Sequence, residues 1–151
     1  MESGMKKITR TALLPYSAKQ MYDLVNDVRA YPQFLPWCGG ADILEQSDSD
    51  MRASVTIAKA GLSQTFTTQN HLVEAKRIEM QLIDGPFKAL RGEWSFKALD
   101  ADACKILFEI EFEVKSGLLN LAIGPVFEQI ASSLVDSFCE RAKQIYPNPF
   151  D

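Results

Sequence analysis

The stretch CKILFEIEFEV, residues 104–114, has the clearest periodicity in the chain. Every second residue from Cys104 to Val114 is apolar, and the positions between them carry mainly lysine and glutamate. This period of two predicts a β-strand that buries one face and leaves the other in water. Such a strand requires a second layer that covers its apolar side.

The C-terminal segment, residues 125–146, is the element best suited to form that layer. Pro125 fits the first turn of a helix. Phe127, Ile130, Leu134, Phe138 and Ile145 then recur mostly at spacings of three or four residues, with charged residues between them. This spacing predicts a long helix with one apolar face.

The remaining elements complete an α+β pattern. The sequence predicts a first strand at 6–14, a helix at 18–28 capped by Ser17, and a short aromatic segment at 31–37. Further strands are expected at 41–46, 51–59, 62–73, 77–83 and 90–98. We therefore expect a curved antiparallel sheet of about six to seven strands wrapped around the long C-terminal helix, with short helices after the first strand. Residues 6–146 are expected to form one domain, with tails at 1–5 and 147–151.

Composition excludes several classes of protein. The chain has 151 residues, of which 46% are hydrophobic and 24% are charged, as in an ordinary globular domain. No apolar run approaches the ~18–20 residues that span a bilayer. The net charge of −4 argues against general binding to nucleic-acid backbones, although a local basic patch remains open. Three cysteines and one histidine predict neither a disulfide framework nor a metal site, and favour the cytoplasm.

Several longer stretches resemble a known family. The two most specific are YPQFLPWC, residues 31–38, and DGPFKALRGEWSF, residues 84–96. KAGLSQTFTTQN at 59–70 and VFEQIASSLVDSFCERAKQIYP at 126–147 agree with them. Together they resemble the START-like helix-grip domains, also called the polyketide cyclase or Bet v 1-like superfamily. Within it they are most similar to the branch of bacterial ribosome association toxins (RatA) and mitochondrial coenzyme Q-binding proteins.

The resemblance implies a non-enzymatic protein with one or both of two activities. One is binding of ubiquinone or a related polyprenyl lipid between sheet and helix, in support of respiration. The other is binding to the large ribosomal subunit, which blocks subunit association and inhibits translation. The alternative is a cyclase- or aromatase-like enzyme that uses the same cavity. No cofactor is expected other than the bound lipid, and the oligomeric state stays open.

A sheet curled around one helix favours an internal cavity for an apolar ligand. The predicted lining consists of Val55, Ile57, Phe66, Thr68, Asn70, Met80, Trp94, Phe96, Phe108, Ile110, Phe112, Val126, Phe127, Ile130, Leu134 and Phe138. The alternative is that each apolar residue of this set is an ordinary core residue that contacts no ligand. Thr68 and Asn70 share the inward face with Phe66 and are candidates to hydrogen-bond a ligand carbonyl, whereas His71 points outward.

Two further sets of residues are candidates for contacts with partners. The expected cavity rim, which is also a candidate for transient membrane contact, consists of Tyr31, Phe34, Leu35, Trp37, Leu118 and Leu121. The alternative is a plug that closes one end of the sheet. Lys6, Arg10, Lys88 and Arg91 are candidates to contact ribosomal RNA phosphate, and the alternative is isolated surface charges.

Overall fold

The computed structural model describes residues 5–117 and 122–147. Its centre is one antiparallel sheet of seven strands in the order β1-β7-β6-β5-β4-β3-β2. The strands are β1 (Lys6–Leu14), β2 (Cys38–Gln46), β3 (Asp50–Lys59), β4 (Leu62–Val73), β5 (Arg77–Asp84), β6 (Phe87–Asp100) and β7 (Ala103–Val114). The predicted fold class is therefore confirmed.

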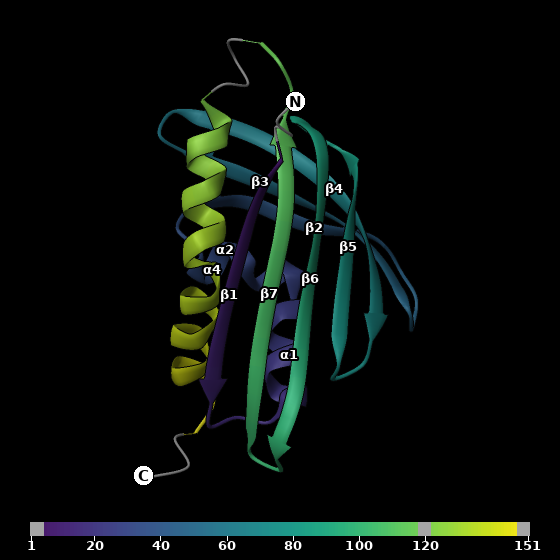
Figure 1. Ribbon diagram of the computed structural model, residues 1–151, viewed down its shortest axis with the longest axis vertical. Coiled ribbons are helices and arrows are strands. Elements are labelled where there is room, and N and C mark those ends of the chain that lie inside the picture. Colours follow the sequence, from purple (N-terminus) through teal and green to yellow (C-terminus); the bar gives the residue numbers. More distant parts are fainter. Residues whose placement is uncertain (1–4, 118–121, 148–151) are drawn as a thin grey trace.

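The helices lie on the concave side of this sheet (Figure 1). They are α1 (Ala18–Asn26), the 3-10 turn η1 (Val28–Ala30), α2 (Tyr31–Phe34) and the long α4 (Ile123–Ile145). Figure 1 shows α4 running alongside β1 and β7, while β2, β3 and β4 curve away behind them. Among the described residues, no helix is both long and apolar enough to cross a membrane.

Strand β7 buries the face that its alternation predicts. Its inward residues from Cys104 to Phe112 are each at most 5% exposed. It pairs with β1 along one edge, where Ile8 lies opposite Ile110, and with β6 along the other, where Trp94 lies opposite Phe108. Because directly opposite residues share a face, the three strands present a continuous apolar surface to α4.

Helix α1 begins as expected and ends earlier than expected. The Ser17 side chain accepts a hydrogen bond from the Gln20 amide at 3.0 Å, and the Gln20 side chain accepts one from the Ser17 amide at 2.9 Å. This reciprocal pair is a capping box. The helix stops at Asn26, and Val28 belongs to the 3-10 turn that follows.

Two strands begin three residues earlier than the sequence predicts. Strand β2 starts at Cys38, and its register against β3 shifts between Cys38 and Gly40 and again between Ile43 and Glu45. Strand β6 starts at Phe87, and its register against β7 shifts between Phe87 and Ala89. Simple alternation from Leu90 would turn Phe87 outward. The irregularity instead buries Phe87, which is 1% exposed.

The long helix follows its predicted period except near its C-terminus. Phe127, Ile130 and Phe138 are buried as expected. Ile145 is 44% exposed, so its assignment to the apolar face is wrong. In the last turn of α4 the buried residue is Ala142, which is 0% exposed, and Tyr146 donates a hydrogen bond to the Gln20 carbonyl at 2.8 Å.

Gly85, in the turn between β5 and β6, provides a test of this packing. Its φ of +149° is unfavourable for other residues, and a Cβ there would lie 2.6 Å from Phe66 Cβ and 3.1 Å from Phe66 Cα. Gly85→Ala should lower the free energy of unfolding by at least about 2 kcal/mol, because backbone strain and overpacking add. Urea denaturation measures this change.

Gly61→Ala is the matched control for that measurement. Gly61 also has a positive φ, of +79°, but apart from its two neighbours in the chain no described residue lies within 4 Å of the position that an added methyl group would take. Only backbone strain of about 1 kcal/mol should appear. Equal losses in the two variants would show that the contact with Phe66 does not constrain the turn.

Candidate functional site

A cavity of about 90 Å³ lies between the concave face of the sheet and α4. The sheet contributes residues from β3 to β7, and α4 contributes one side of the wall. The lining residues are Val28, Tyr31, Trp37, Ala53, Val55, Phe66, Thr68, Asn70, Met80, Leu90, Trp94, Phe108, Ile110, Phe127, Ile130, Ala131 and Leu134. The wall is therefore almost entirely apolar, with two short polar side chains on β4.

Eleven of the sixteen residues expected at the cavity line it: Val55, Phe66, Thr68, Asn70, Met80, Trp94, Phe108, Ile110, Phe127, Ile130 and Leu134. Whether they bind a ligand stays a prediction. Val28, Ala53, Leu90 and Ala131 were not predicted. Ala53 and Leu90 share strand faces with predicted residues, and Ala131 lies four residues after Phe127 on α4. The spacing of two in strands and four in helices could therefore have predicted these three residues.

The other five predicted residues lie outside the cavity wall. Ile57, Phe96, Phe112 and Phe138 are at most 4% exposed and belong to the solid core, whereas Val126 is half-buried on the first turns of α4. Phe96 packs edge-to-face on Tyr22 of α1, with ring centroids 5.7 Å apart. The three phenylalanines point inward as expected, but other rings cover them.

Packed aromatic rings explain why the cavity is small. At one end Phe127 makes edge-to-face contacts with Phe87 and Phe112, each with centroids 4.7 Å apart. At the other end Trp94 stacks on Phe108 at 4.2 Å and meets Phe138 edge-on at 5.4 Å. The rings fill both ends of the space under α4, so only its middle stays open.

The two polar side chains on the wall are buried and bonded to each other. Thr68 and Asn70 are each 6% exposed. The Thr68 hydroxyl donates to Asn70 Oδ1 at 2.8 Å. Tyr31 is the titratable residue of the lining. Burial raises its pKa, and its hydroxyl donates to the Val25 carbonyl. The wall therefore suits binding of an apolar molecule better than proton transfer.

The four predicted rim residues that the structure describes fall into three groups. Tyr31 and Trp37 line the cavity, and both are half-buried. Phe34 faces an outer groove beside α4, where the Arg141 guanidinium lies 5.0 Å from its ring centroid. Leu35 is 1% exposed and does not line the cavity, so its placement at the rim is wrong: the turn after α2 folds it into the core.

The remaining two rim residues, Leu118 and Leu121, lie outside the described residues.

The four predicted ribosome contacts do not form one patch. Lys6 and Arg10 lie on β1, whereas Lys88 and Arg91 lie on β6. Lys6 Nζ is 2.7 Å from a carboxylate of α4, and Arg91 Nη2 is 2.9 Å from a carboxylate of β7. Within the described part of the chain, Arg10 and Lys88 have no ion-pair partner. Of the four side chains, Arg10 and Lys88 therefore have the positive charges that are least neutralised by carboxylates.

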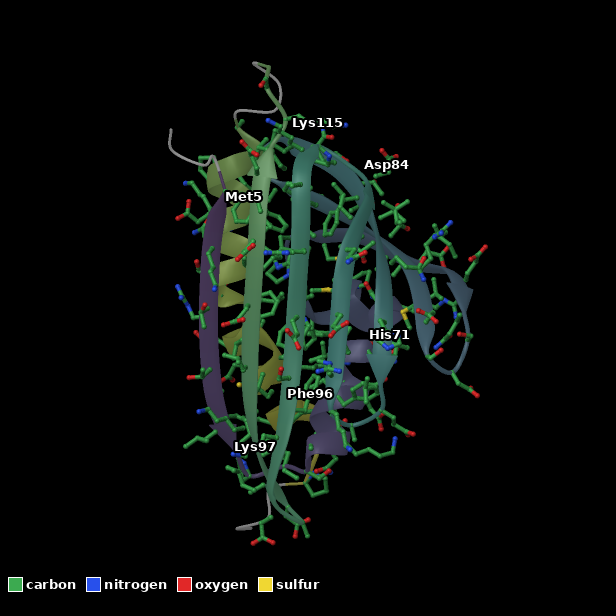
Figure 2. All side chains as sticks on the ribbon, turned by 45° about the vertical axis from the view of Figure 1, so that its right-hand side comes forward. Met5, His71, Asp84, Phe96, Lys97 and Lys115 are labelled. Atoms are coloured by element: carbon green, nitrogen blue, oxygen red, sulfur yellow. The ribbon has the colours of Figure 1, made fainter. Side chains whose placement is uncertain are left out.

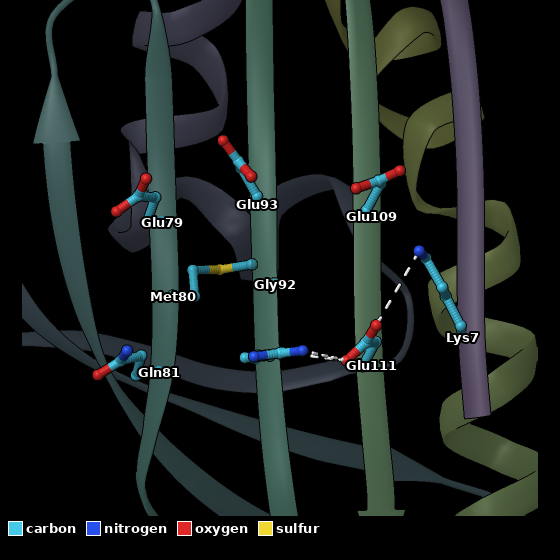
Figure 3. A pocket seen from close by; sticks show the side chains of 9 residues that line it. Lys7, Glu79, Met80, Gln81, Gly92, Glu93, Glu109 and Glu111 are labelled. Carbon is cyan, nitrogen blue, oxygen red and sulfur yellow. Dashed lines mark hydrogen bonds and ion pairs between the residues drawn. The ribbon is translucent and has the colours of Figure 1, made fainter. Parts of the chain in front are cut away.

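The convex face of the sheet carries a second, open hollow of about 310 Å³ (Figure 3). It is lined by Lys7, Glu79, Met80, Gln81, Arg91, Gly92, Glu93, Glu109 and Glu111. Arg91 Nε donates to Glu111 at 3.0 Å, and Lys7 Nζ lies 4.0 Å from the same carboxylate. This charged, solvated hollow offers little to an apolar ligand, so the cavity under α4 is the better candidate.

His71 is exposed on β4, on the face opposite Asn70 (Figure 2). Its outward direction is as predicted. A carboxylate neighbour was not predicted, yet Asp50 Oδ1 lies 3.5 Å from His71 Nδ1 on the neighbouring strand. The cavity does not include this pair.

Comparison with known proteins defines the family. Residues 14–139 match the family described as polyketide cyclase / dehydrase and lipid transport. The chain belongs to this family. The ribosome association toxin RatA of Pseudomonas aeruginosa is 53% identical over 92% of this chain and 96% of its own. RatA of Escherichia coli K12 is 52% identical over 97% of this chain and 92% of its own.

A more distant relative carries a different name. The mitochondrial coenzyme Q-binding protein COQ10 of Drosophila melanogaster is 28% identical over 90% of this chain and 58% of its own. This chain therefore belongs to the branch of the family that holds RatA and the coenzyme Q-binding proteins. These relatives are not named as enzymes.

Solved structures agree with the fold. An 18 kDa protein from Caulobacter crescentus has a TM-score of 0.72 and 32% identity, with 93% of this chain and 98% of that chain covered. The Zhui aromatase/cyclase from Streptomyces has a TM-score of 0.80 at 18% identity, with 93% and 94% covered. The second likeness concerns the fold alone.

The cysteines provide a test of the packing around the site. Burial raises the pKa of all three thiols, to about 11 for Cys104, which is fully buried on β7. At pH 8 only about one Cys104 thiol in a thousand is then ionised, and the thiolate is the reactive form. Iodoacetamide should therefore alkylate Cys104 more slowly than half-buried Cys139, and the rate should rise with pH.

Mass spectrometry of the peptides measures this order of reaction. In urea all three cysteines should react alike. A native Cys104 that reacts as fast as free cysteine would contradict the packing of β7 against α4.

Proposed function

We propose that the protein binds the large ribosomal subunit and impedes its association with the small subunit. The observation that carries this proposal is identity of more than 50%, over more than 90% of both chains, to proteins named ribosome association toxins. Identity to the coenzyme Q-binding relative is 28%. A cytoplasmic location is part of this proposal.

The size of the cavity supports ranking ribosome association first. Pockets that enclose small ligands typically measure roughly 300–1,000 Å³. The cavity here is about 90 Å³, which is too small to enclose a polyprenyl chain without rearrangement. A function exercised through the surface does not depend on that volume.

Arg10 and Lys88 are the proposed contacts to ribosomal RNA phosphate. Both side chains are exposed, and Arg10 uses one Nη1 bond on the Thr9 carbonyl. An arginine or lysine without a carboxylate partner keeps its full charge for phosphate. Lys6 and Arg91 would first have to give up the carboxylates they contact, so we expect them to contribute less.

Co-sedimentation with separated ribosomal subunits, over a series of salt concentrations, tests the proposal. The protein should pellet with the large subunit and dissociate as salt rises. Arg10→Glu combined with Lys88→Glu should weaken binding by about ten- to a hundredfold and reduce the salt slope by about two, because each phosphate contact contributes about one. Absence of pelleting by the unaltered protein at any salt would overturn the proposal.

Lys143→Glu is the matched control. Lys143 is exposed near the C-terminus of α4, where it contacts Glu140 on the same helix at 3.0 Å. The substitution changes the net charge by the same amount as Arg10→Glu or Lys88→Glu does, but it lies on α4 and leaves β1 and β6 unaltered. A loss of binding as large as that of Arg10→Glu or Lys88→Glu measured alone would indicate a general charge effect and would exclude Arg10 and Lys88 as specific contacts.

A second proposed function is binding of an apolar ligand in the cavity under α4. The apolar wall, the lipid-transport description of the family and the coenzyme Q-binding relative support it. Ubiquinone itself would require the cavity to enlarge. The two functions make separate demands, because one uses exposed cations and the other uses buried rings.

A further inference from the structure

The convex face of the sheet has no helix over it in the described part of the chain. Figure 1 shows β1, β7, β6 and β5 side by side, with the helices on their other side. Because these strands pair in register, residues that lie directly opposite each other form rows across the face. Two of these rows carry charges of a single sign.

The first of these rows is acidic. Glu93 on β6 lies directly opposite Glu79 on β5 and Glu109 on β7, and all three line the hollow shown in Figure 3. Arg77 Nε lies 3.2 Å from a carboxylate oxygen of Glu79 and 3.8 Å from one of Glu93. Glu109 has no ion-pair partner among the described residues. Like charges directly opposite each other destabilise a sheet, so this row holds negative charge that the chain only partly neutralises.

The second row is basic. Lys97 on β6 lies directly opposite Lys105 on β7, and both side chains are exposed. Neither has an ion-pair partner within residues 5–117 and 122–147. Leu13, opposite Lys105 on β1, extends the row and is 71% exposed. This pair of lysines is also unfavourable in an isolated sheet, and a surface that presents carboxylates would relieve the repulsion.

A row without acidic side chains separates the two charged rows. Its members on β1, β7 and β6 are Thr11, Leu107 and Ser95, and on β5 it ends at Arg77. Along β7, Glu109 follows Leu107 by two residues and Lys105 precedes it by two. The same spacing holds along β6, which runs in the opposite direction. The acidic and basic rows therefore lie on opposite sides of this central row, each about 7 Å from it.

This arrangement of charges is complementary to itself. A second copy can face the first after a half-turn about the central row, which places its acidic row over the basic row of the first copy. Lys105 then faces the partner's Glu109, and Lys97 faces the partner's Glu93. Each of these contacts occurs twice, because a twofold axis relates the two copies. Leu107 meets the partner's Leu107 at the axis.

We propose that two copies of this chain associate through the convex faces of β6 and β7, in a symmetric dimer held by these lysine–glutamate pairs. Charge complementarity favours a second copy over other partners. A surface with charges of one sign, such as RNA or an anionic membrane, would attract one row and repel the other. The dimer leaves α4 and the cavity beneath it uncovered, since they lie on the other side of the sheet.

Analytical ultracentrifugation of the full chain, from micromolar to millimolar concentration, tests the proposal. At low salt a species of two chains should accumulate as the concentration rises, and added salt should weaken it because the charges are in contact with solvent. Lys97→Glu combined with Lys105→Glu should raise the dissociation constant of the dimer by about a hundredfold or more, because each lysine–glutamate pair becomes repulsive. Glu93→Lys combined with Glu109→Lys should have the same effect.

Charge exchange distinguishes this interface from any other. The chain with all four substitutions has the net charge of the unaltered protein and rows of opposite sign, so it should form the dimer again. The two double variants should form a mixed dimer with each other, although each alone stays monomeric. Lys59→Glu combined with Lys143→Glu is the matched control. Both lysines contact side chains of α4, on the other side of the sheet, and the dissociation constant should stay nearly unchanged.

Three results would overturn the proposal. The first is a single chain at every concentration at low salt. The second is a dimer that both double variants leave intact, and the third is a dimer that the fourfold exchange does not restore. Circular dichroism checks that each variant folds, and if one double variant does not, the other and the fourfold exchange still decide the question. Ribosome co-sedimentation and ligand binding are measured separately, so the two proposed functions do not depend on this result.

Discussion

The fold depends on contact between the apolar face of the sheet and helix α4. A curved sheet that is open on one side leaves its inward residues in water unless another layer covers them. Burying an apolar side chain contributes about 1.5–3 kcal/mol, and α4 brings Phe127, Ile130 and Phe138 to this interface. The short helices add to this cover, since α1 lies against β6 and β7 and α2 lies against β2.

That same contact determines the size of the cavity. The curvature of the sheet encloses more space than a helix backbone fills, so large aromatic rings occupy most of it. Where the α4 residues are smaller, at Ala131 and Leu134, the space stays open. Packing and binding therefore compete for the same volume: a larger cavity would require the loss of ring contacts that hold the helix to the sheet.

Local patterns in the sequence predict much of this arrangement. The alternation of β7, the period of α4 and the cap at Ser17 depend on a few neighbouring residues, and the inward direction of Thr68 and Asn70 follows from Phe66 by counting. The register shift at the start of β6 interrupts the alternation, so counting along the strand does not predict that Phe87 is buried. Which inward ring lines the cavity and which is covered depends on side-chain packing between elements, which a linear pattern does not contain. The burial of Leu35 has the same origin.

The irregular strand β2 has a consequence for how the molecule behaves in a crowded solution. It is a free edge of the sheet, and an exposed edge invites pairing with a strand of another molecule. At Ile43 the backbone N–H donates to the Asp42 carboxylate at 2.8 Å, and Arg29 Nη2 approaches the carbonyl at 3.5 Å. With these groups engaged, and with two shifts in register nearby, the edge is a poor template for edge-to-edge aggregation.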